Sequence, residues 1–251
     1  MLALVSAMAE EIASVIDTLS DVSTKEFGGR KFHTGKFHGV EVAAVFSRYG
    51  KVAAAATVTQ LLASYPVDRL IFGGVAGGVQ PGLKIGDIVV ATDLVQHDMD
   101  ASPLFPRYEV PLLGKARFAT DPDLRAALTQ AARLFAEHDL ANHVSHVERT
   151  FFKMTVPKVV EGMVASGDKF FASSEGVRDL RERLPGVCCV EMEGAAVAQV
   201  CDEYGVPFAV VRTISDSADE NSVHDFPRFA REIARHYSKG VLVRYLNLGN
   251  T

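Results

Sequence analysis

This sequence lacks the features that mark membrane-spanning or disulfide-stapled proteins. Its 251 residues include only three cysteines, and these have neither disulfide nor metal spacing. No apolar run approaches the roughly 20 residues of a membrane helix. The apolar start, MLALVSAM, has no basic leader and is followed by Glu10 and Glu11, so it predicts a buried strand rather than a signal peptide. We therefore expect a cytoplasmic protein with reduced thiols and no membrane partner.

The chain also lacks an excess of basic charge. Its formal net charge is −5, and it contains no dense stripe of Lys and Arg. Both observations argue against nucleic acid as the main partner. The eight histidines form no ligand pattern with acids or cysteines, so we expect no metal site and no cofactor. These absences leave a small molecule as the expected partner.

What the sequence does have is an alternation of strand and helix patterns from end to end. Apolar residues make up 48% of the chain and charged residues 23%, a composition typical of a globular protein with one large core. No Pro/Ser-rich linker, low-complexity tract or internal repeat divides it. The sequence predicts a single α/β domain over residues 1–251, with a central mixed β-sheet flanked by helices.

The predicted elements follow from hydrophobic spacing and turn residues. Strands are expected at residues 2–8, 69–72, 86–92, 159–166, 187–190 and 208–214, and a hairpin at 31–37 and 40–47. Helices are expected at residues 10–19, 51–63, 121–138, 174–184, 195–204 and 226–246, with Asp121 as an N-cap. Residues 93–118 predict an irregular loop, and residues 142–158 resist assignment.

Acids stand close to the ends of three predicted strands. Glu11 follows the first strand, Glu193 the strand at 187–190, and Asp216 the strand at 208–214. Ligands of open α/β sheets bind outside the carboxyl ends of strands, so this placement favours function for the three acids. Clustered carboxyl groups also push their pKa values apart, which suits proton transfer. For Glu191, the neighbouring acid, we favour a structural role satisfied by an Arg or by backbone amides.

Several segments together resemble the nucleoside phosphorylase and nucleosidase superfamily. They are SAMAEEI, YGKVAAA, VAGGVQPGLKIGDIVVA, ASGDKFF, VEMEGAAVAQVC and VVRTISDSAD, and the match covers about four-fifths of the chain. Within the superfamily the chain is most similar to the 5′-methylthioadenosine/S-adenosylhomocysteine nucleosidases. The resemblance implies a three-layer α/β/α fold and hydrolysis of the bond between adenine and ribose, with no cofactor.

By the matching motifs, the resemblance assigns roles to four polar residues. Glu11 would be the general base for water, and Asp216 would protonate or share a proton with purine nitrogen 7. Glu193 would accept hydrogen bonds from the ribose hydroxyls and favour the cationic sugar. Arg212 would orient Glu193 and the water.

The resemblance also implies a substrate-binding surface. Phe170 matches the ring that stacks on adenine, and Phe171 a position whose backbone contacts the base edge. Further residues match the walls of the pocket: Met8, Tyr49, Met192 and Phe226. Ser215 adjoins Asp216, and Val75 stands where some of these nucleosidases place a Ser. Ordinary core packing is the alternative for each apolar residue among them.

The phosphate-binding Arg and Ser of bacterial phosphorylases align with Phe72 and Val75, so the resemblance favours water over phosphate as the nucleophile. Arg48 is either an anion-binding group or a solvated edge residue, and we favour the second. Three alternatives remain: a nucleosidase for another adenosine derivative such as 5′-deoxyadenosine or aminodeoxyfutalosine, a phosphate-dependent purine nucleoside phosphorylase, and a catalytically silent storage or binding relative. Relatives imply a homodimer, in which residues 101–118 would help complete the 5′ pocket.

Overall fold

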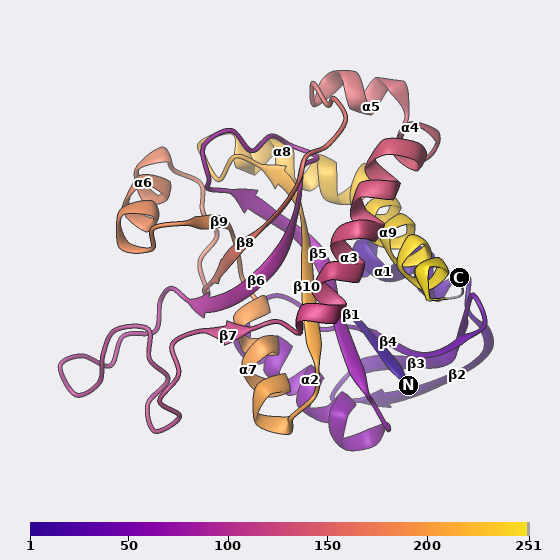
Figure 1. Cartoon of the computed structure of the whole chain (residues 1–251), viewed down its shortest axis with the longest axis horizontal. Helices are drawn as coiled ribbons and strands as arrows, with labels where there is room; N and C mark the ends of the chain where they lie inside the picture. The colour runs from indigo at the N-terminus through magenta and orange to yellow at the C-terminus, as the bar shows by residue number, and fades with distance from the viewer. Residues whose placement is uncertain (250–251) are drawn as a thin grey trace.

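A mixed β-sheet forms the centre of the molecule in this computed structural model, which describes residues 1–249 (Figure 1). Its strands are β1 Leu2–Ser6, β2 Ser20–Phe27, β3 Arg30–Phe37, β4 Val40–Phe46, β5 Arg69–Gly78, β6 Ile88–Gln96, β7 Phe118–Ala119, β8 Val159–Ser166, β9 Val187–Glu191 and β10 Phe208–Asp216. The helices are α1 Ala9–Ile16, α2 Lys51–Ser64, α3 Pro122–Leu134, α4 Leu140–His143, α5 His146–Phe151, α6 Ser174–Arg183, α7 Gly194–Tyr204, α8 Ser222–Phe229 and α9 Arg235–Leu248. Two π-helical segments, η1 Phe135–Asp139 and η2 Ala230–Ala234, follow α3 and α8.

The sheet has the strand order β10-β6-β8-β9-β5-β1-β4-β3-β2, and an additional pairing joins β10 to β5. Five strands, β5, β10, β6, β8 and β9, therefore close on one another, while β1, β4, β3 and β2 continue outward as an open sheet. Strand β5 is the junction: it pairs in parallel with β1 and β10 and antiparallel with β9. The centre of β5 is thus flanked by strands running in both directions.

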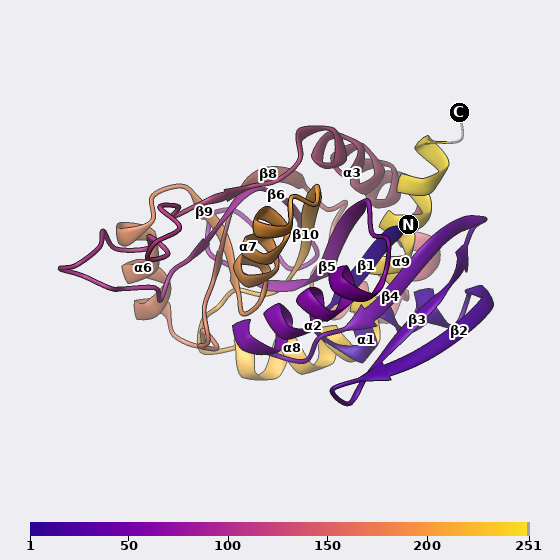
Figure 2. The ribbon, with the colours of Figure 1, turned by 90° about the horizontal axis from the view of Figure 1, so that it is seen from below.

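Helices cover both faces of the sheet and give three layers (Figure 2). On one face, α1, α3 and α9 bury apolar residues such as Ile12, Leu128 and Val241. On the other, α2 and α7 bury an alanine- and valine-rich surface that includes Val58 and Val197. The two separate apolar clusters explain why most strands read as continuous buried runs, since a sheet covered on both faces has no solvent-facing side. The predicted α/β/α fold is confirmed.

Most predicted elements are confirmed, including the hairpin of β3 and β4 and the N-cap of α3. Asp121 accepts hydrogen bonds from the backbone N–H groups of Asp123 and Leu124. The prediction missed β2, because nearly all of its residues are exposed and polar, so no apolar alternation marks it.

The single closing helix predicted for residues 226–246 is wrong. The structure breaks this stretch into α8, η2 and α9, and places Pro227 inside α8. Proline removes a backbone donor and crowds the preceding turn, and π-helical turns absorb such irregularities. Residues 142–158, which the sequence pattern does not assign, contain the end of α4 and the short helix α5.

Within residues 1–249, none of the helices combines the length and apolarity that crossing a membrane requires. The same residues contain no group of three or more His, Cys, Asp or Glu side chains arranged to hold a metal ion.

Candidate active site

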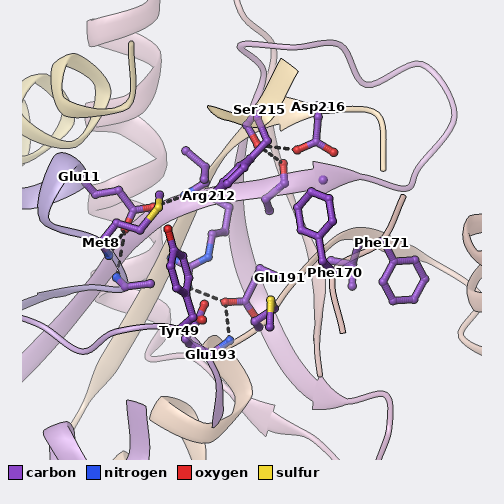
Figure 3. Close-up of a pocket in the computed structure, with 18 of the residues that line it drawn as sticks. Met8, Glu11, Tyr49, Phe170, Phe171, Glu191, Glu193, Arg212, Ser215 and Asp216 are labelled. Carbon is purple, nitrogen blue, oxygen red and sulfur yellow. Dashed lines mark hydrogen bonds and ion pairs between the residues drawn. The ribbon is translucent and has the colours of Figure 1, made fainter. Parts of the chain in front are cut away.

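A cavity of about 420 Å³ opens beside the middle of β5 (Figure 3). Its volume falls within the usual range for small-molecule sites. Every residue predicted for the site lines it: Met8, Glu11, Tyr49, Val75, Phe170, Phe171, Met192, Glu193, Arg212, Ser215, Asp216 and Phe226. The structure therefore brings together side chains from stretches that are far apart along the chain.

Glu11 lies in the first turn of α1 and is almost completely buried. Its Oε2 accepts hydrogen bonds from the backbone N–H groups of Ala7 and Met8, each at 3.0 Å, and its Oε1 accepts one from Val75 at 2.9 Å. Burial raises the pKa of Glu11 to about 7, although the Arg212 charge and these three hydrogen bonds oppose the shift. A carboxyl group with this pKa exchanges a proton readily at neutral pH.

Gly74 of β5 makes room for the Glu11 carboxylate. A Cβ at position 74 would lie 2.8 Å from Glu11 Oε1, closer than such contacts allow, and 3.2 Å from Arg212 Nη1. Within the glycine cluster that follows residue 72, Gly74 is therefore needed so that the Glu11 and Arg212 side chains can approach the backbone of β5.

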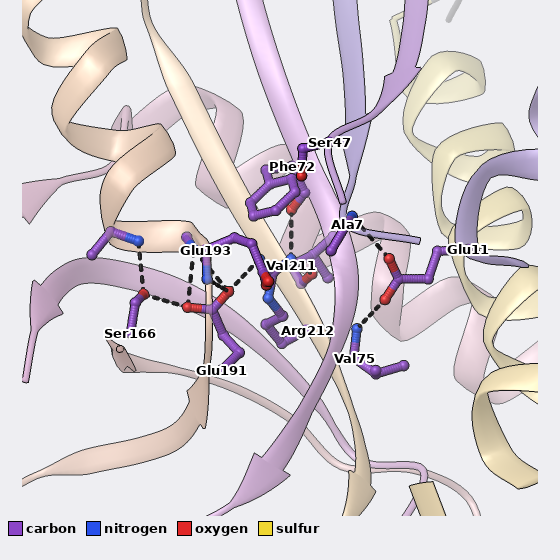
Figure 4. A network of polar contacts seen from close by, with 12 residues as sticks. Ala7, Glu11, Ser47, Phe72, Val75, Ser166, Glu191, Glu193, Val211 and Arg212 are labelled. Atoms are coloured by element: carbon purple, nitrogen blue, oxygen red, sulfur yellow. Dashed lines mark hydrogen bonds and ion pairs between the residues drawn. The ribbon is translucent and has the colours of Figure 1, made fainter. Parts of the chain in front are cut away.

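Glu191 is satisfied entirely by the protein, as predicted (Figure 4). Arg212 Nη2 donates to its Oε2 at 2.8 Å, and Gly194 N donates to both of its oxygens at 3.0 and 2.8 Å. The Ser166 hydroxyl donates to Oε1 as well. Both members of the ion pair are buried, with side-chain exposures of 2% for Arg212 and 4% for Glu191.

Arg212 makes no hydrogen bond to Glu193 among the described residues, although its charge partly offsets the rise that burial causes in the pKa of Glu193. The guanidinium is held by Glu191, by the carbonyl oxygens of Phe72 and Val211, and by the Phe72 ring, whose centroid lies 4.1 Å away. Glu191, which holds Arg212, is the last residue of β9, whereas Glu193 lies beyond the strand as the N-cap of α7. Arg212 Nε is buried and has no hydrogen-bond partner within residues 1–249.

Glu193 faces the cavity from the start of α7. Its Oε1 accepts a hydrogen bond from Gly50 N at 2.7 Å, which ties α7 to the start of α2, and its Oε2 has no protein donor among the described residues. Burial raises the pKa of Glu193, and the nearby negative charge of Glu191 raises it further. One oxygen is therefore available to a ligand.

Asp216, the last residue of β10, is the third buried acid. Its Oδ2 accepts a hydrogen bond from the Ser215 hydroxyl at 2.7 Å, and its Oδ1 accepts one from Ala218 N at 2.8 Å. Burial raises the pKa of Asp216 despite these hydrogen bonds. The protonated form is thus more populated than in an ordinary aspartate.

The three acids lie at or just past the carboxyl ends of β1, β9 and β10, but these strands do not all run in the same direction. Gly77 of β5 pairs with Asp216 of the parallel strand β10 and with Val190 of the antiparallel strand β9. Glu193 and Asp216 therefore approach β5 from strands of opposite direction. The acids meet because the closed ring of strands places β9 and β10 on either side of the same residue.

Aromatic and thioether side chains form the rest of the cavity wall. Phe170 is 43% exposed and its ring lies 5.6 Å from that of Phe226. Phe171 is buried and packs edge-on against His97 at 5.3 Å. Tyr49 is 60% exposed at the cavity mouth. Phe170 is thus the ring available for stacking, whereas the Phe171 side chain is held by the protein core.

Sequence reasoning missed part of the lining: Ala7, Gly73, Gly74, Ala76, Gly77, Lys169 and Val190. Glu191 also lines the cavity, in the structural role expected for it. The glycines were visible as a cluster but could not be assigned singly. Lys169 adds a cation whose Nζ lies 5.7 Å from the centroid of the Phe171 ring, and no local pattern marks it. Arg48, in contrast, lies outside the lining and donates to the Gly29 carbonyl at 2.7 Å, as expected of an edge residue.

Comparison with known proteins places this geometry among relatives. The family model described as "Phosphorylase superfamily" matches residues 1–247. A 5′-methylthioadenosine/S-adenosylhomocysteine nucleosidase from Chromohalobacter salexigens is 36% identical over 250 residues, covering 99% of this chain and 97% of that protein.

Two solved structures have a similar fold over nearly the whole chain. The 5′-methylthioadenosine/S-adenosylhomocysteine nucleosidase from Neisseria meningitidis, in complex with methylthio-immucillin-A, superimposes with a TM-score of 0.86 at 33% identity and 98% coverage of both chains. A futalosine hydrolase mutant of Helicobacter pylori strain 26695 superimposes with a TM-score of 0.83 at 32% identity, again with 98% coverage of both.

Proposed function

This chain belongs to the phosphorylase superfamily, and from that premise we propose that it is a nucleosidase acting on 5′-methylthioadenosine and S-adenosylhomocysteine. It is a hydrolase that cleaves the N-glycosidic bond and releases adenine and the 5′-substituted ribose. The observation that carries the proposal is the enclosure of Glu11, Glu193 and Asp216 in one largely apolar cavity of small-molecule size. We infer further that residues 1–251 form one nucleosidase domain, in keeping with a single family model over residues 1–247.

Glu11 is the proposed general base. The leaving of adenine generates a sugar that resembles an oxocarbenium ion, and water must lose a proton as it adds to the anomeric carbon. A carboxyl group with a pKa of about 7 accepts that proton at neutral pH. The three backbone N–H groups that hold Glu11 fix the direction from which it acts.

Asp216 is the proposed acid for the leaving group. Adenine departs most easily when nitrogen 7 is protonated or strongly hydrogen-bonded, because the ring then leaves as a neutral molecule. Burial raises the pKa of Asp216, which favours the protonated carboxyl that such donation needs. Ser215 positions the carboxyl by donating a hydrogen bond to Oδ2. The proton of Asp216 is then donated to nitrogen 7 of the purine, or shared with it, from Oδ1.

Glu193 is the proposed partner of the ribose hydroxyls. Its Oε2 is available for them, while Gly50 fixes Oε1. A cationic sugar beside Glu193 favours the ionised carboxylate, so the interaction strengthens as positive charge develops. An interaction that is stronger in the transition state than in the ground state accelerates the reaction.

Arg212 is proposed to position the attacking water, and Val75 to position Glu11, which activates it. The buried Nε of Arg212 needs an acceptor, and a water molecule between Arg212 and Glu11 would provide one. Val75 supplies its backbone N–H to Glu11 and no side-chain hydrogen bond to water. Because Glu191 anchors the guanidinium, Arg212 remains positioned without a contact to Glu193.

The apolar wall is proposed to hold the base and the 5′ group. Phe170 stacks on adenine, with Phe226 supporting its ring, and the backbone at Phe171 contacts the base edge. The remaining wall residues contact ribose and the 5′ substituent: Met8, Tyr49 and Met192. A thioether is polarisable and adapts to a sulfur-bearing substituent.

Water rather than phosphate is the proposed nucleophile. Only Arg212 and Lys169 among the lining residues are cationic, and Arg212 is already paired with Glu191. A phosphate dianion in a partly dry cavity needs several charge-assisted hydrogen bonds. A silent storage relative is disfavoured because all three acids are in place.

A second candidate substrate is aminodeoxyfutalosine, because the futalosine hydrolase of Helicobacter pylori matches the chain over 98% of its length. Adenine and ribose recognition would be unchanged, and only the 5′ group would differ. The relative turnover of the two nucleosides separates the candidates.

We expect the nucleosidase to act in the cytoplasm as a homodimer. Tyr49 and Phe170 leave the cavity mouth open at 60% and 43% exposure, and the loop after β6 presents Leu104 and Leu112 at 84% and 94% exposure. A second copy that covers these side chains would close the 5′ end of the cavity and exclude water from the reaction.

The experiment is product analysis with 5′-methylthioadenosine in phosphate-free and phosphate-containing buffer. Adenine and methylthioribose are expected in both, at equal rates. A product carrying a phosphate at carbon 1 of the ribose would contradict hydrolysis, and absence of adenine would contradict the proposed function.

A further inference from the structure

A second cavity, of about 1060 Å³, lies away from the proposed active site and shares no lining residue with it. It is formed by α9, α1, the end of η1 and the β3–β4 hairpin, and α9 and α1 lie next to each other in Figure 1. Its lining consists of Ser14, Thr18, Ser20, Lys36, His38, Gly39, Asp139, His143, Arg235, His236, Lys239, Gly240, Val243, Arg244 and Asn247. Nearly all of these residues are polar, and none is a Phe, Tyr or Leu.

The charge of this lining contrasts with that of the whole chain. Lys36, Arg235, Lys239 and Arg244 are cationic and Asp139 is the only acid among the lining residues, whereas the chain has a net charge of −5. The Arg244 guanidinium binds both oxygens of Asp139, at 2.6 and 2.7 Å, so the acid is already neutralised. Positive charge is therefore concentrated at this cavity, although the net charge of the whole chain is negative.

Two of the cations are not engaged in an ion pair. Arg235 and Lys239 lie one helical turn apart on α9, on the same face, and neither has an ion-pair partner within residues 1–249. Lys36 approaches from β3 and its ammonium lies 3.2 Å from exposed Asp21, a surface pair of small energy that an anion could replace. Cations from two separate elements therefore converge on the same space.

Two histidine rings of the lining add further groups that can donate hydrogen bonds. The rings of His143 and His236 lie 6.4 Å apart across the gap between α4 and α9. Burial lowers the pKa of His236, and the charges of Arg235 and His143 lower it further. An anion bound between them would offset that repulsion and favour the protonated ring.

We propose that this cavity binds a chain of phosphate groups, as carried by inorganic polyphosphate or by a nucleoside triphosphate. A single phosphate would occupy a small part of 1060 Å³ and contact few of the cations. A chain of phosphates presents several charges at intervals, which suits cations on two elements and charge-assisted hydrogen bonds from Arg235 and Lys239. Val243 is the only apolar side chain of the lining, which does not suit a fatty chain, and Asp139 is its only acid, which does not suit a cation.

The test is titration calorimetry of the full chain with sodium tripolyphosphate, without magnesium. Tripolyphosphate is expected to bind about tenfold or more tightly than orthophosphate, and more weakly as salt is added. The double variant Arg235→Gln/Lys239→Gln should lose about tenfold or more in affinity. The control Arg178→Gln/Arg181→Gln removes the same charge from exposed positions of α6 and should bind as the unaltered protein does.

Parallel titration with ATP distinguishes the two sources. Because the proposed active site also binds adenine nucleosides, ATP is titrated against both the unaltered protein and the Arg235→Gln/Lys239→Gln variant. ATP binding that is comparable to tripolyphosphate binding and is lost in the variant assigns a nucleoside triphosphate, and tripolyphosphate binding without it assigns inorganic polyphosphate. The proposal is overturned if neither binds, if orthophosphate binds as tightly as tripolyphosphate, or if both double variants lose affinity equally. Adenine release by the Arg235→Gln/Lys239→Gln variant should be unchanged, which would show that it is folded and that the two sites are separate.

Discussion

Arg212 is paired with Glu191 rather than with Glu193: its Nη2 donates to Glu191 Oε2 at 2.8 Å, with both side chains almost fully buried. Because of this ion pair, the two acids of the VEMEG segment, Glu191 and Glu193, have different roles. Glu191 neutralises and anchors the guanidinium, and Glu193 keeps one oxygen for a ligand. The nearby charge of Glu191 also contributes to the raised pKa of Glu193, because one negative charge disfavours a second beside it.

Removing one member of the buried pair should be costly. Arg212→Leu leaves Glu191 charged and buried without its partner, and we expect a loss of about 3–5 kcal/mol, or roughly 10 °C in melting temperature, by calorimetry. The double variant Arg212→Leu/Glu191→Met should recover most of that stability, because no lone charge remains. A single variant as stable as the unaltered protein would contradict the importance of the pair.

Glu11→Gln should abolish base catalysis without unfolding the protein. Glutamine retains the size of the side chain and a carbonyl oxygen for the N–H groups of Ala7 and Met8, but its NH2 group cannot accept from Val75 N and it takes no proton. We expect kcat for adenine release to fall by about 100-fold or more, with an unchanged circular dichroism spectrum. Glu10→Gln, one residue away and exposed, is the matched control and should retain activity. Near-normal turnover by Glu11→Gln would remove Glu11 from its proposed role.

The pH dependence of stability should carry the signature of Glu11. Because its pKa is about 7 in the folded protein, against an ordinary value of 4.5 in the unfolded chain, the folded protein binds more protons between these values. The stabilisation from this group is present below pH 4.5 and is lost as the pH rises through 7, by about 3 kcal/mol in all. In chemical denaturation between pH 4.5 and 7, the free energy of unfolding of the unaltered protein should fall with pH relative to that of Glu11→Gln. Parallel curves would contradict a raised pKa.

The ionisation of Glu11 should also affect catalysis, but activity should rise with pH where stability falls. The base acts when ionised, so the rising limb of the kcat/KM profile should have an apparent pKa of about 7, and a falling limb should mark the loss of the Asp216 proton. Arg212 lowers the pKa of Glu11, and its replacement by Leu should therefore move the rising limb to higher pH. A purely structural role for Arg212 would lower activity without moving the limb.

Asp216→Asn should block protonation of the leaving group. Asparagine has the same shape and keeps an oxygen for Ala218 N, but it has no acidic proton to give. We expect kcat to fall by about 100-fold or more, with substrate still bound, as measured by adenine release and by titration with an uncleaved analogue. Asp219→Asn, which lies nearby but outside the cavity, is the control. Equal effects of the two substitutions would argue against the role of Asp216.

Local pattern was sufficient to predict most helices and strands of this protein. Hydrophobic periodicity identified β8 and the hairpin of β3 and β4, and Asp121 identified the start of α3, because burial and capping act over a few residues. It failed for β2, whose exposed polar residues carry no periodicity, and for the break between α8 and α9, which depends on how Pro227 is accommodated. Motif resemblance supplied the identity of the site residues.

By itself, the sequence determined the α/β class, the helix caps and the identities of the acids near strand ends, since each follows from the chemistry of neighbouring residues. Only the tertiary structure decided which groups contact one another. Strands of opposite direction meet at Gly77, Glu191 rather than Glu193 takes Arg212, and α9 aligns with the β3–β4 hairpin to gather cations. The physical reason is that burial, pairing and pKa depend on distances across the closed sheet, between residues far apart along the chain, and no local spacing encodes those distances.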